Sequence, residues 1–438
     1  MKTIKDYKLI ILVLMMLLAC GQQATRLKLD PDGYGKTVTS NGIRVLVNQD
    51  KTTSLTAARI LIGGGVLTET AEDNGVSNLM INMLMKGNSG MTAEEITEQL
   101  DFLGAEVFAD CYRDYSAISF VSLTENFEKV LEIISQSLLS PTFPPEELAK
   151  LKQEMVGRIK ASNDSQSQAS NKLFWKTAYG DQGYGLPTLG TEQSLVDITP
   201  DDIKRHYHDY LGGSNMVFSM VTDLPVEQIG SLIDKYLSGV KSDAREITAP
   251  ARSLQEEKTG FIKYDRNQSF IFMGEILDHL APGDVPYVVL LNEVMGNNVG
   301  SRLWYLRQKE KLAYAVYTQY IINKYGAAFL AAIGTDTTKV KTALSSLNRE
   351  WDSMVNDGVT ADELRDAKVN MKNNLIYRID RKSNRANNMA YYEYIGYGYH
   401  FILDMINKAD SITLDELNQY VKNRFTDDNK FVSIVGKR

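Results

Sequence analysis

The chain has 438 residues, of which 43% are hydrophobic and 24% charged, and its 31 Gly and 10 Pro show none of the biases of collagen, coiled coil or disorder. A length of this order predicts about two or three domains and excludes a single small binding module. The net charge of −7, with no strong basic tract, argues against nucleic acid as a partner.

The first nineteen residues are typical of a signal peptide. Three lysines precede an unbroken apolar run over residues 9–19, which is too short to span a bilayer. The run ends in Leu17-Leu18-Ala19-Cys20-Gly21, which resembles the lipobox of bacterial lipoproteins, whose Cys becomes the acylated first residue. A chance Cys after an ordinary signal peptide is the alternative, and the small Ala19 argues against it. We therefore expect a signal peptide over 1–19 and lipidation of Cys20.

The lipid anchor predicts a location in the cell envelope, on a membrane and facing the periplasm, with residues 20–35 as a tether. Multiple acyl chains hold a folded domain on a membrane almost irreversibly. Gly21 stands where an inner-membrane retention signal often has Asp, which favours the outer membrane. The only other cysteine is Cys111, so no intramolecular disulfide is available, and we expect Cys111 to be a buried apolar filler.

The following residues alternate between strand-like and helical patterns. Strand patterns cover 42–49, 58–67 and 117–123, and helical patterns cover 75–86, 93–105 and 145–163. We expect the strands within 39–65 to follow one another as a hairpin, which favours a largely antiparallel sheet over a parallel, doubly wound one. The helix over 75–86 is rich in Leu, Met and Ile all round and is expected to be buried core.

Two internal repeats indicate a duplicated domain. Residues 198–223 match 412–437 without gaps at an offset of 214, and 145–155 match 361–371 at an offset of 216. Residues 241–258 are polar, contain Ala-Pro-Ala and lack periodicity, and are expected to be a linker. The fold class is therefore α+β, with two homologous domains over 36–240 and 259–438, each a mixed, largely antiparallel sheet packed against helices.

The segment 75–87, Gly-Val-Ser-Asn-Leu-Met-Ile-Asn-Met-Leu-Met-Lys-Gly, resembles a motif of the M16 (insulinase or pitrilysin-type) metallopeptidases. The resemblance covers nearly everything from about residue 36 to 438 and is to the short bacterial kind, similar to the mitochondrial processing peptidase subunits. In that family the motif is His-x-x-Glu-His between a Gly and a Lys-Gly. Here Asn78 and Asn82 stand at the two His positions and Ile81 at the Glu position.

These replacements remove the chemistry of zinc hydrolysis, which needs nitrogen or anionic ligands on one helix face and a carboxylate near the bound water. The third ligand of the family, a Glu, falls at about Gly157 or Arg158, and a register slip that brought in Glu154 would not rescue the site. His206 and His208 lie two apart on a helical pattern, so they diverge, and we expect both at the surface or the edge of the core. His279 and His400 have no neighbouring ligand pattern. We predict no metal and no cofactor in this chain.

Residues 297–316 resemble the second-domain signature of the same family: a Gly-rich turn, Ser-Arg-Leu, then Leu-Arg followed by Leu-Ala-Tyr. The resemblance implies that Arg307 and Tyr314 are the pair that binds substrate and the transition state opposite the zinc site. We expect a short helix ending near Glu310, then a strand over 312–322. The alternative is an Arg in a solvated charge cluster and a Tyr packed on a sheet.

The zinc motif is lost while the Arg/Tyr signature is kept. In some members of the family that this chain resembles, one subunit supplies the zinc helix and another supplies the Arg/Tyr pair. The resemblance predicts the non-zinc subunit of a heterodimeric peptidase, inactive alone, whose partner is an M16-like chain with an intact His-x-x-Glu-His motif and the zinc. The expected substrates are unfolded peptides, bound partly by strand addition to a sheet edge.

Two alternatives stay open. The first is a catalytically inert pseudopeptidase that binds peptides or acts as a scaffold on the membrane, since a fold does not by itself imply a function. The second is an autonomous metallopeptidase with unrecognised ligands.

Overall fold

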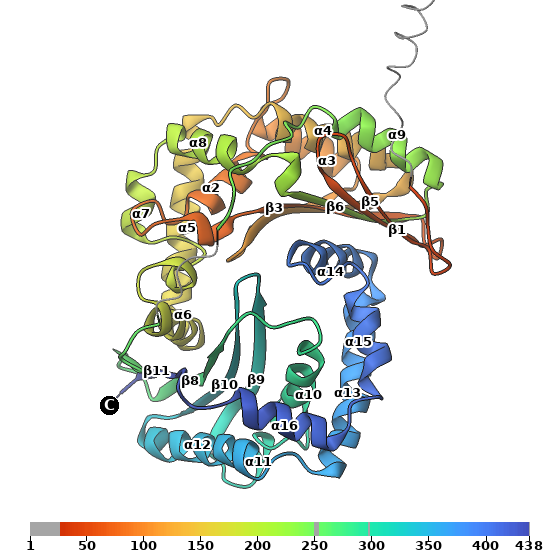
Figure 1. The fold of residues 1–438 in the computed structure, drawn as a ribbon. Coiled ribbons are helices and arrows are strands. Elements are labelled where there is room, and N and C mark those ends of the chain that lie inside the picture. The colour runs from red at the N-terminus through yellow and green to blue at the C-terminus, as the bar shows by residue number, and fades with distance from the viewer. Residues whose placement is uncertain (1–26, 249–253, 297, 438) are drawn as a thin grey trace, which may run out of the picture.

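The computed structural model describes residues 27–248, 254–296 and 298–437, which form two units, each a sheet with helices, facing one another (Figure 1). The signal peptide, Cys20, the start of the expected tether, part of the expected linker, and Asn297 lie outside the described residues. Within the described residues, no helix is both long enough and apolar enough to cross a membrane.

The first sheet has six strands in the order β1-β2-β6-β3-β5-β4. Their bounds are β1 Tyr34–Val38, β2 Arg44–Gln49, β3 Leu55–Gly63, β4 Glu106–Cys111, β5 Tyr115–Leu123 and β6 Met216–Thr222. All neighbours are antiparallel except β2 and β6, which are parallel. The expected hairpin of β2 and β3 is wrong, because β6 lies between them. Both strands are apolar enough to be central, and alternation along a strand does not identify its neighbours.

The second sheet has five strands in the order β7-β11-β8-β10-β9, which repeats the order β2-β6-β3-β5-β4 of the first. Its strands are β7 Thr259–Lys263, β8 Gln268–Leu277, β9 Ala313–Asn323, β10 Gly326–Asp336 and β11 Lys430–Gly436. The β7–β11 pair is parallel and the rest antiparallel, as in the first sheet. The expected α+β fold with two mixed, largely antiparallel sheets is therefore confirmed.

Helices cover both sheets. Those of the first half are α2 Val76–Met83, α3 Ala93–Phe102, α4 Phe127–Leu139, α5 Pro145–Asp164, α6 Gln166–Tyr179, α7 Glu192–Asp197, α8 Pro200–Tyr210 and α9 Val226–Leu237. Those of the second half are α10 Val285–Met295, α11 Trp304–Gln308, α12 Val340–Asn356, α13 Ala361–Asp380, α14 Lys382–Tyr394, α15 Phe401–Ala409 and α16 Leu414–Arg424. The described residues between α9 and β7 form no named helix or strand.

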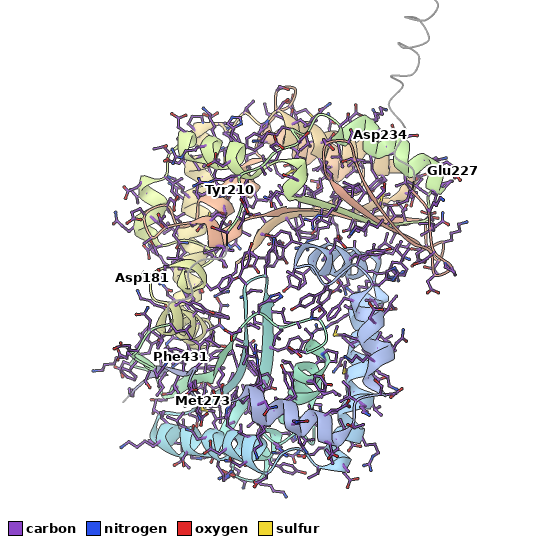
Figure 2. All side chains as sticks on the ribbon, in the orientation of Figure 1. Asp181, Tyr210, Glu227, Asp234, Met273 and Phe431 are labelled. Atoms are coloured by element: carbon purple, nitrogen blue, oxygen red, sulfur yellow. The ribbon has the colours of Figure 1, made fainter. Side chains whose placement is uncertain are left out.

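The two halves exchange one helix each. Helix α6 of the first half packs on β8 and β11 of the second sheet, whereas α14 of the second half packs on β3 and β6 of the first sheet (Figure 1). On α6, the Phe174 ring lies 6.5 Å from the ring of Phe431, which Figure 2 labels beside the second sheet. At α14, Arg385 forms an ion pair of 3.0 Å with Asp50. Each half therefore completes the core of the other.

Candidate functional site

Helix α2 carries the segment that resembles the zinc motif, and it is buried on nearly every side. It begins after Gly75, whose φ of 105° favours glycine. The Glu69 carboxylate accepts hydrogen bonds from the backbone N–H of Gly75 at 2.8 Å and of Ser77 at 2.9 Å. A carboxylate at this end satisfies N–H groups that have no partner within the helix. Burial raises the pKa of Glu69 to about 7. The expectation of a buried core helix is confirmed.

The side chains at the three motif positions of α2 make contacts within the protein. Asn78 is 4% exposed, and its Nδ2 donates to the backbone oxygen of Thr188 at 3.0 Å. Asn82 Nδ2 donates to Asn78 Oδ1 at 3.0 Å and to the Asn78 backbone oxygen at 2.9 Å. Ile81 is fully buried in the apolar core. Both ends of the Asn78 amide are thus committed to the protein, and these residues do not fit a zinc ion.

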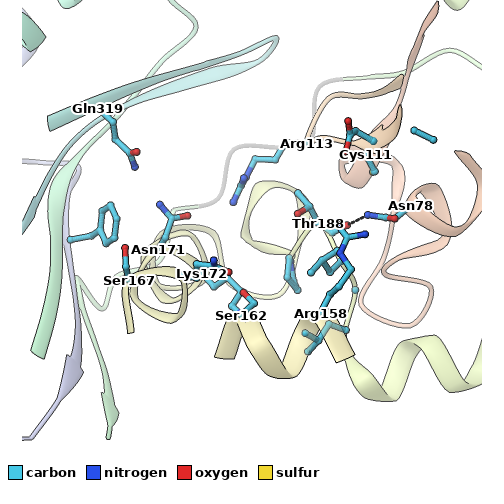
Figure 3. Close-up of a pocket in the computed structure, with 18 of the residues that line it drawn as sticks. Asn78, Cys111, Arg113, Arg158, Ser162, Ser167, Asn171, Lys172, Thr188 and Gln319 are labelled. Carbon is cyan, nitrogen blue, oxygen red and sulfur yellow. Dashed lines mark hydrogen bonds between the residues drawn. The ribbon is translucent and has the colours of Figure 1, made fainter. Parts of the chain in front are cut away.

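Helix α5 brings a cation to the place where the family has its third ligand. Arg158 and Asn78 line one cavity of about 420 Å³, shown in Figure 3. Gly157 offers no side chain, and Glu154 is exposed and does not line this cavity. A guanidinium carries a permanent positive charge and cannot coordinate a metal cation. Over the described ranges, no three or more His, Cys, Asp or Glu side chains are grouped so that they could hold a metal ion.

The four histidines have different surroundings. His206 is 7% exposed and its Nε2 lies 3.0 Å from Ser77 Oγ, so placing it at the surface or the edge of the core was wrong. Burial lowers the pKa of His206 to about 4. His208 is exposed, as expected, and so is His279. His400 Nε2 lies 3.1 Å from Asp30 Oδ2.

The cavity beside Asn78 has a strongly basic lining that the sequence did not reveal. Arg113, Arg158 and Lys172 line it together with a single carboxylate, Asp110. The Arg113 guanidinium lies 4.3 Å from the centre of the Trp175 ring, and burial lowers the pKa of Arg113 to about 10. Lys172 also has its pKa lowered by burial. The cations come from the β4–β5 turn, α5 and α6, so no local pattern joins them.

Cys111 also lines this cavity. It is half-buried and packs against the core of the first half on one side. The expectation of a buried apolar filler is therefore met only in part: Cys111 packs on the core, but it stays partly exposed because it is the last residue of β4, the terminal strand of its sheet.

The second half carries Arg307 and Tyr314 on the expected short helix and strand, α11 and β9. Arg307 is exposed, with its guanidinium 5.0 Å from the centre of the Trp304 ring. Tyr314 is 43% exposed, and partial burial raises its pKa. Its ring lies against Gly334 of β10, where a Cβ atom would come within 2.6 Å of Tyr314 Cζ.

The position of Gly334 shows which face of the second sheet carries Tyr314. Leu330 and Ala332 precede it on alternate positions of β10 and pack in the core beneath α6 together with Phe272. Tyr314 therefore lies on the sheet face from which Phe272 and Tyr317 also reach the cavity beside Asn78. Neither Arg307 nor Tyr314 lines that cavity. The structure therefore does not bring the Arg/Tyr pair into the cavity that Asn78 lines.

The Arg of the Ser-Arg-Leu sequence has a structural role. Arg302 donates to both oxygens of Glu363 at 2.7 and 2.8 Å and to the backbone oxygen of Gly358. Glu363 in turn caps the start of α13 with Thr360. This bidentate pair ties the turn before α11 to α13 and so positions the helix that bears Arg307.

The comparisons with known proteins agree with this architecture. The sequence model described as "Insulinase (Peptidase family M16)" matches residues 44–192, and that described as "Peptidase M16 inactive domain" matches residues 197–371. The chain is 26% identical over 396 residues to a Bacillus subtilis protein named "Uncharacterized zinc protease YmxG", which covers 89% of this chain and 95% of the relative. It is 23% identical over 371 residues to the "Non-peptidase homolog YmxG" of Helicobacter pylori, covering 82% of this chain and 84% of the relative.

A solved structure shows the same fold. The crystal structure of a peptidase M16 inactive domain from Pseudomonas fluorescens superposes with a TM-score of 0.85 at 19% identity, covering 92% of this chain and 98% of that one. The two sequence models together match most of residues 44–371. The chain therefore belongs to the M16 peptidase family.

Proposed function

We propose that this chain is the non-zinc subunit of a heterodimeric M16-like peptidase, and that Arg307 and Tyr314 complete the site of a partner chain with an intact His-x-x-Glu-His motif. The observation that carries the proposal is an asymmetry between the halves. In the first half, the Asn78 and Asn82 amides are bonded to each other and Ile81 is buried. In the second half, Arg307 and Tyr314 keep exposed polar groups.

The exposed pair has the chemistry that peptide hydrolysis needs. Negative charge develops on the scissile carbonyl oxygen, and a phenol hydroxyl fixed in advance can donate a hydrogen bond to it. A phenol is protonated at neutral pH, and partial burial raises the pKa of Tyr314 further, so its hydroxyl can act as a donor. Arg307 offers a planar fork of donors for a substrate carbonyl or carboxylate, and its stacking on Trp304 restricts the side chain.

The family relatives support a chain that does not hydrolyse peptides alone. One relative is named a non-peptidase homolog, and one matched family model is described as an inactive domain. Other relatives are named zinc proteases, so family membership alone does not decide the activity. The observation on this chain itself that argues against hydrolysis is the Asn78–Asn82 pair on α2.

The proposed place of action rests on the sequence alone. Cys20 is proposed to carry the lipid that holds the chain on a membrane of the cell envelope, facing the periplasm. Replacing Cys20 with Ala should move the chain from the membrane pellet to the soluble fraction. An unchanged distribution would contradict lipid anchoring.

The test of the proposed function uses the purified full chain, a purified M16 chain with the intact motif, and their mixture. The chain alone should contain no stoichiometric zinc and should leave an unfolded peptide uncleaved, while the mixture should cleave it faster than the partner alone. Chelator-sensitive hydrolysis by the chain alone would overturn the proposal and support the autonomous peptidase. Complex formation without any gain in cleavage would favour the inert scaffold.

A further inference from the structure

We propose that the cavity beside Asn78 binds a carboxylate group of an extended peptide. The inference goes beyond the proposed function, because it needs neither hydrolysis nor a second subunit. It rests on that function only in taking a peptide as the ligand.

The charge of the lining points to an anion. Arg113, Arg158 and Lys172 face one carboxylate, Asp110, although the whole chain carries a net charge of −7. Within the described ranges none of the three cations forms an ion pair with a carboxylate: Arg113 Nε donates to the backbone oxygen of Tyr184 at 3.3 Å, and Lys172 donates to the neutral amide oxygen of Asn163. Unpaired cations around a partly enclosed space attract an anion more strongly than they would in open water.

Neutral donors also face the cavity. Gln319 Nε2 of β9 is buried and has no hydrogen-bond partner among the described residues. A buried N–H donor without an acceptor is unfavourable, so an oxygen-bearing ligand at this position would satisfy it. Figure 3 shows Gln319 and Asn171 on one side of the cavity, with Arg113 extending towards Asn171 and Lys172.

The strands around the cavity favour a peptide over a small free anion. The terminal strand of each sheet contributes: Ala109 and Asp110 come from β4, and Tyr317 and Gln319 from β9. In the described structure β4 pairs only with β5, so its outer edge can accept an extended chain by strand addition. The apolar rings of Phe272 and Tyr317 provide a surface for the residue that carries the carboxylate.

The test measures binding of three synthetic peptides of equal length to the purified full chain by calorimetry. One peptide has an apolar sequence with a free C-terminal carboxylate, the second is its C-terminal amide, and the third is the amide with one internal Glu. We expect the best carboxylate-bearing peptide to bind at least about tenfold more tightly than the neutral amide, as for a charge-assisted hydrogen bond. Comparing the first and third peptides shows whether the terminus or an acidic side chain supplies the carboxylate.

Variants then locate the effect. Arg158→Gln and Lys172→Gln each remove one positive charge from a side chain that is not fully buried, and each should reduce the preference for the carboxylate peptide about tenfold or more. Lys160→Gln is the matched control, because Lys160 lies two residues further along α5 and does not line the cavity. It should leave the preference unchanged.

The inference would be overturned by equal binding of all three peptides, by no binding up to millimolar concentration, or by a preference that survives both cavity variants. Because the assay uses the chain alone and measures no cleavage, its outcome is independent of whether the heterodimer hydrolyses peptides.

Discussion

Asn78 and Asn82 show how a metal-binding face can become a structural one without disturbing the helix. An amide has both donors and an acceptor, so the Asn82 amide can bond to Asn78, and Asn78 in turn to the Thr188 carbonyl. The neighbouring Ile81 fills the apolar core, where a carboxylate would be costly to bury. Restoring any one of the three positions would therefore not restore a zinc site.

Tyr314 is the residue whose removal should affect turnover most directly. Tyr314→Phe deletes only the hydroxyl, so the ring still packs on Gly334. Losing one donor to a developing oxyanion should lower kcat of the reconstituted heterodimer by about tenfold or more, with assembly intact. Steady-state kinetics on the purified pair measures this.

Tyr305→Phe is the matched control, because Tyr305 is similarly exposed on α11 and its ring lies 4.7 Å from the Lys309 ammonium. It should leave kcat unchanged. If both variants retain full turnover, Tyr314 has no catalytic role and the scaffold alternative gains support.

His206 should make stability depend on pH. Its folded pKa is about 4, below the ordinary value of 6.5, so between these pH values the unfolded chain binds the extra proton. The contribution of neutral His206 to the free energy of unfolding is therefore fully present above about pH 6.5 and is lost as the pH falls towards 4. Between pH 7 and 5 the wild type should lose about 2 kcal/mol more free energy of unfolding than His206→Gln.

Glu69 titrates in the opposite sense, because its raised pKa gives the folded state the extra proton as pH falls from about 7. It is present in both proteins of the His206 comparison, so the difference between their denaturant unfolding curves isolates the histidine. Parallel pH profiles for the wild type and His206→Gln would show that His206 is protonated equally in both states.

At the scale of elements, the start of α2 depends on a residue outside the helix. The two Glu69 oxygens accept three N–H groups, from Asn74, Gly75 and Ser77. Glu69→Gln keeps the shape but turns one acceptor into a donor that faces other donors, so we expect a loss of about 1–3 kcal/mol in the free energy of unfolding. Chemical denaturation checks this.

The control for that change is Glu98→Gln, on the exposed side of α3. Its free energy of unfolding should stay within about 0.5 kcal/mol of the wild type. A Glu69→Gln protein as stable as this control would mean that the carboxyl is protonated in the fold and that its amide substitute is equally well bonded.

At the scale of the whole molecule, the exchange of α6 and α14 makes each half depend on the other. Without the second half, the apolar face of the first sheet that α14 covers, including Leu61, Val217 and Val221, would meet water. We expect fragment 27–240 alone to bind a hydrophobic dye and to unfold without a sharp transition. Mixing it with fragment 259–438 should restore cooperative unfolding, measured by calorimetry. A sharp transition of the isolated fragment would contradict this.

Much of this architecture could be read from the residues because it rests on local patterns. The amphipathic pattern over 145–163 corresponds to α5, and the apolar segment 75–86 contains α2. The matched pairs 145–155/361–371 and 198–223/412–437 correspond to α5 and α13, and to the α8–β6 and α16–β11 units. The placement of β6 between β2 and β3 could not be read, because it depends on a contact between strands more than 150 residues apart.

The candidate site divides in the same way. Asn78, Ile81 and Asn82 indicate the loss of the zinc site through residue type and spacing alone, because a neutral amide is a poor zinc ligand and an aliphatic side chain can neither bind the metal nor act as a base. The basic cavity was decided only by tertiary structure. Arg113, Arg158 and Lys172 lie on three elements, and Gln319 comes from the other half of the chain. A local pattern determines what one helix or strand can do, whereas the meeting of charges from distant segments depends on how the two sheets and the exchanged helices pack.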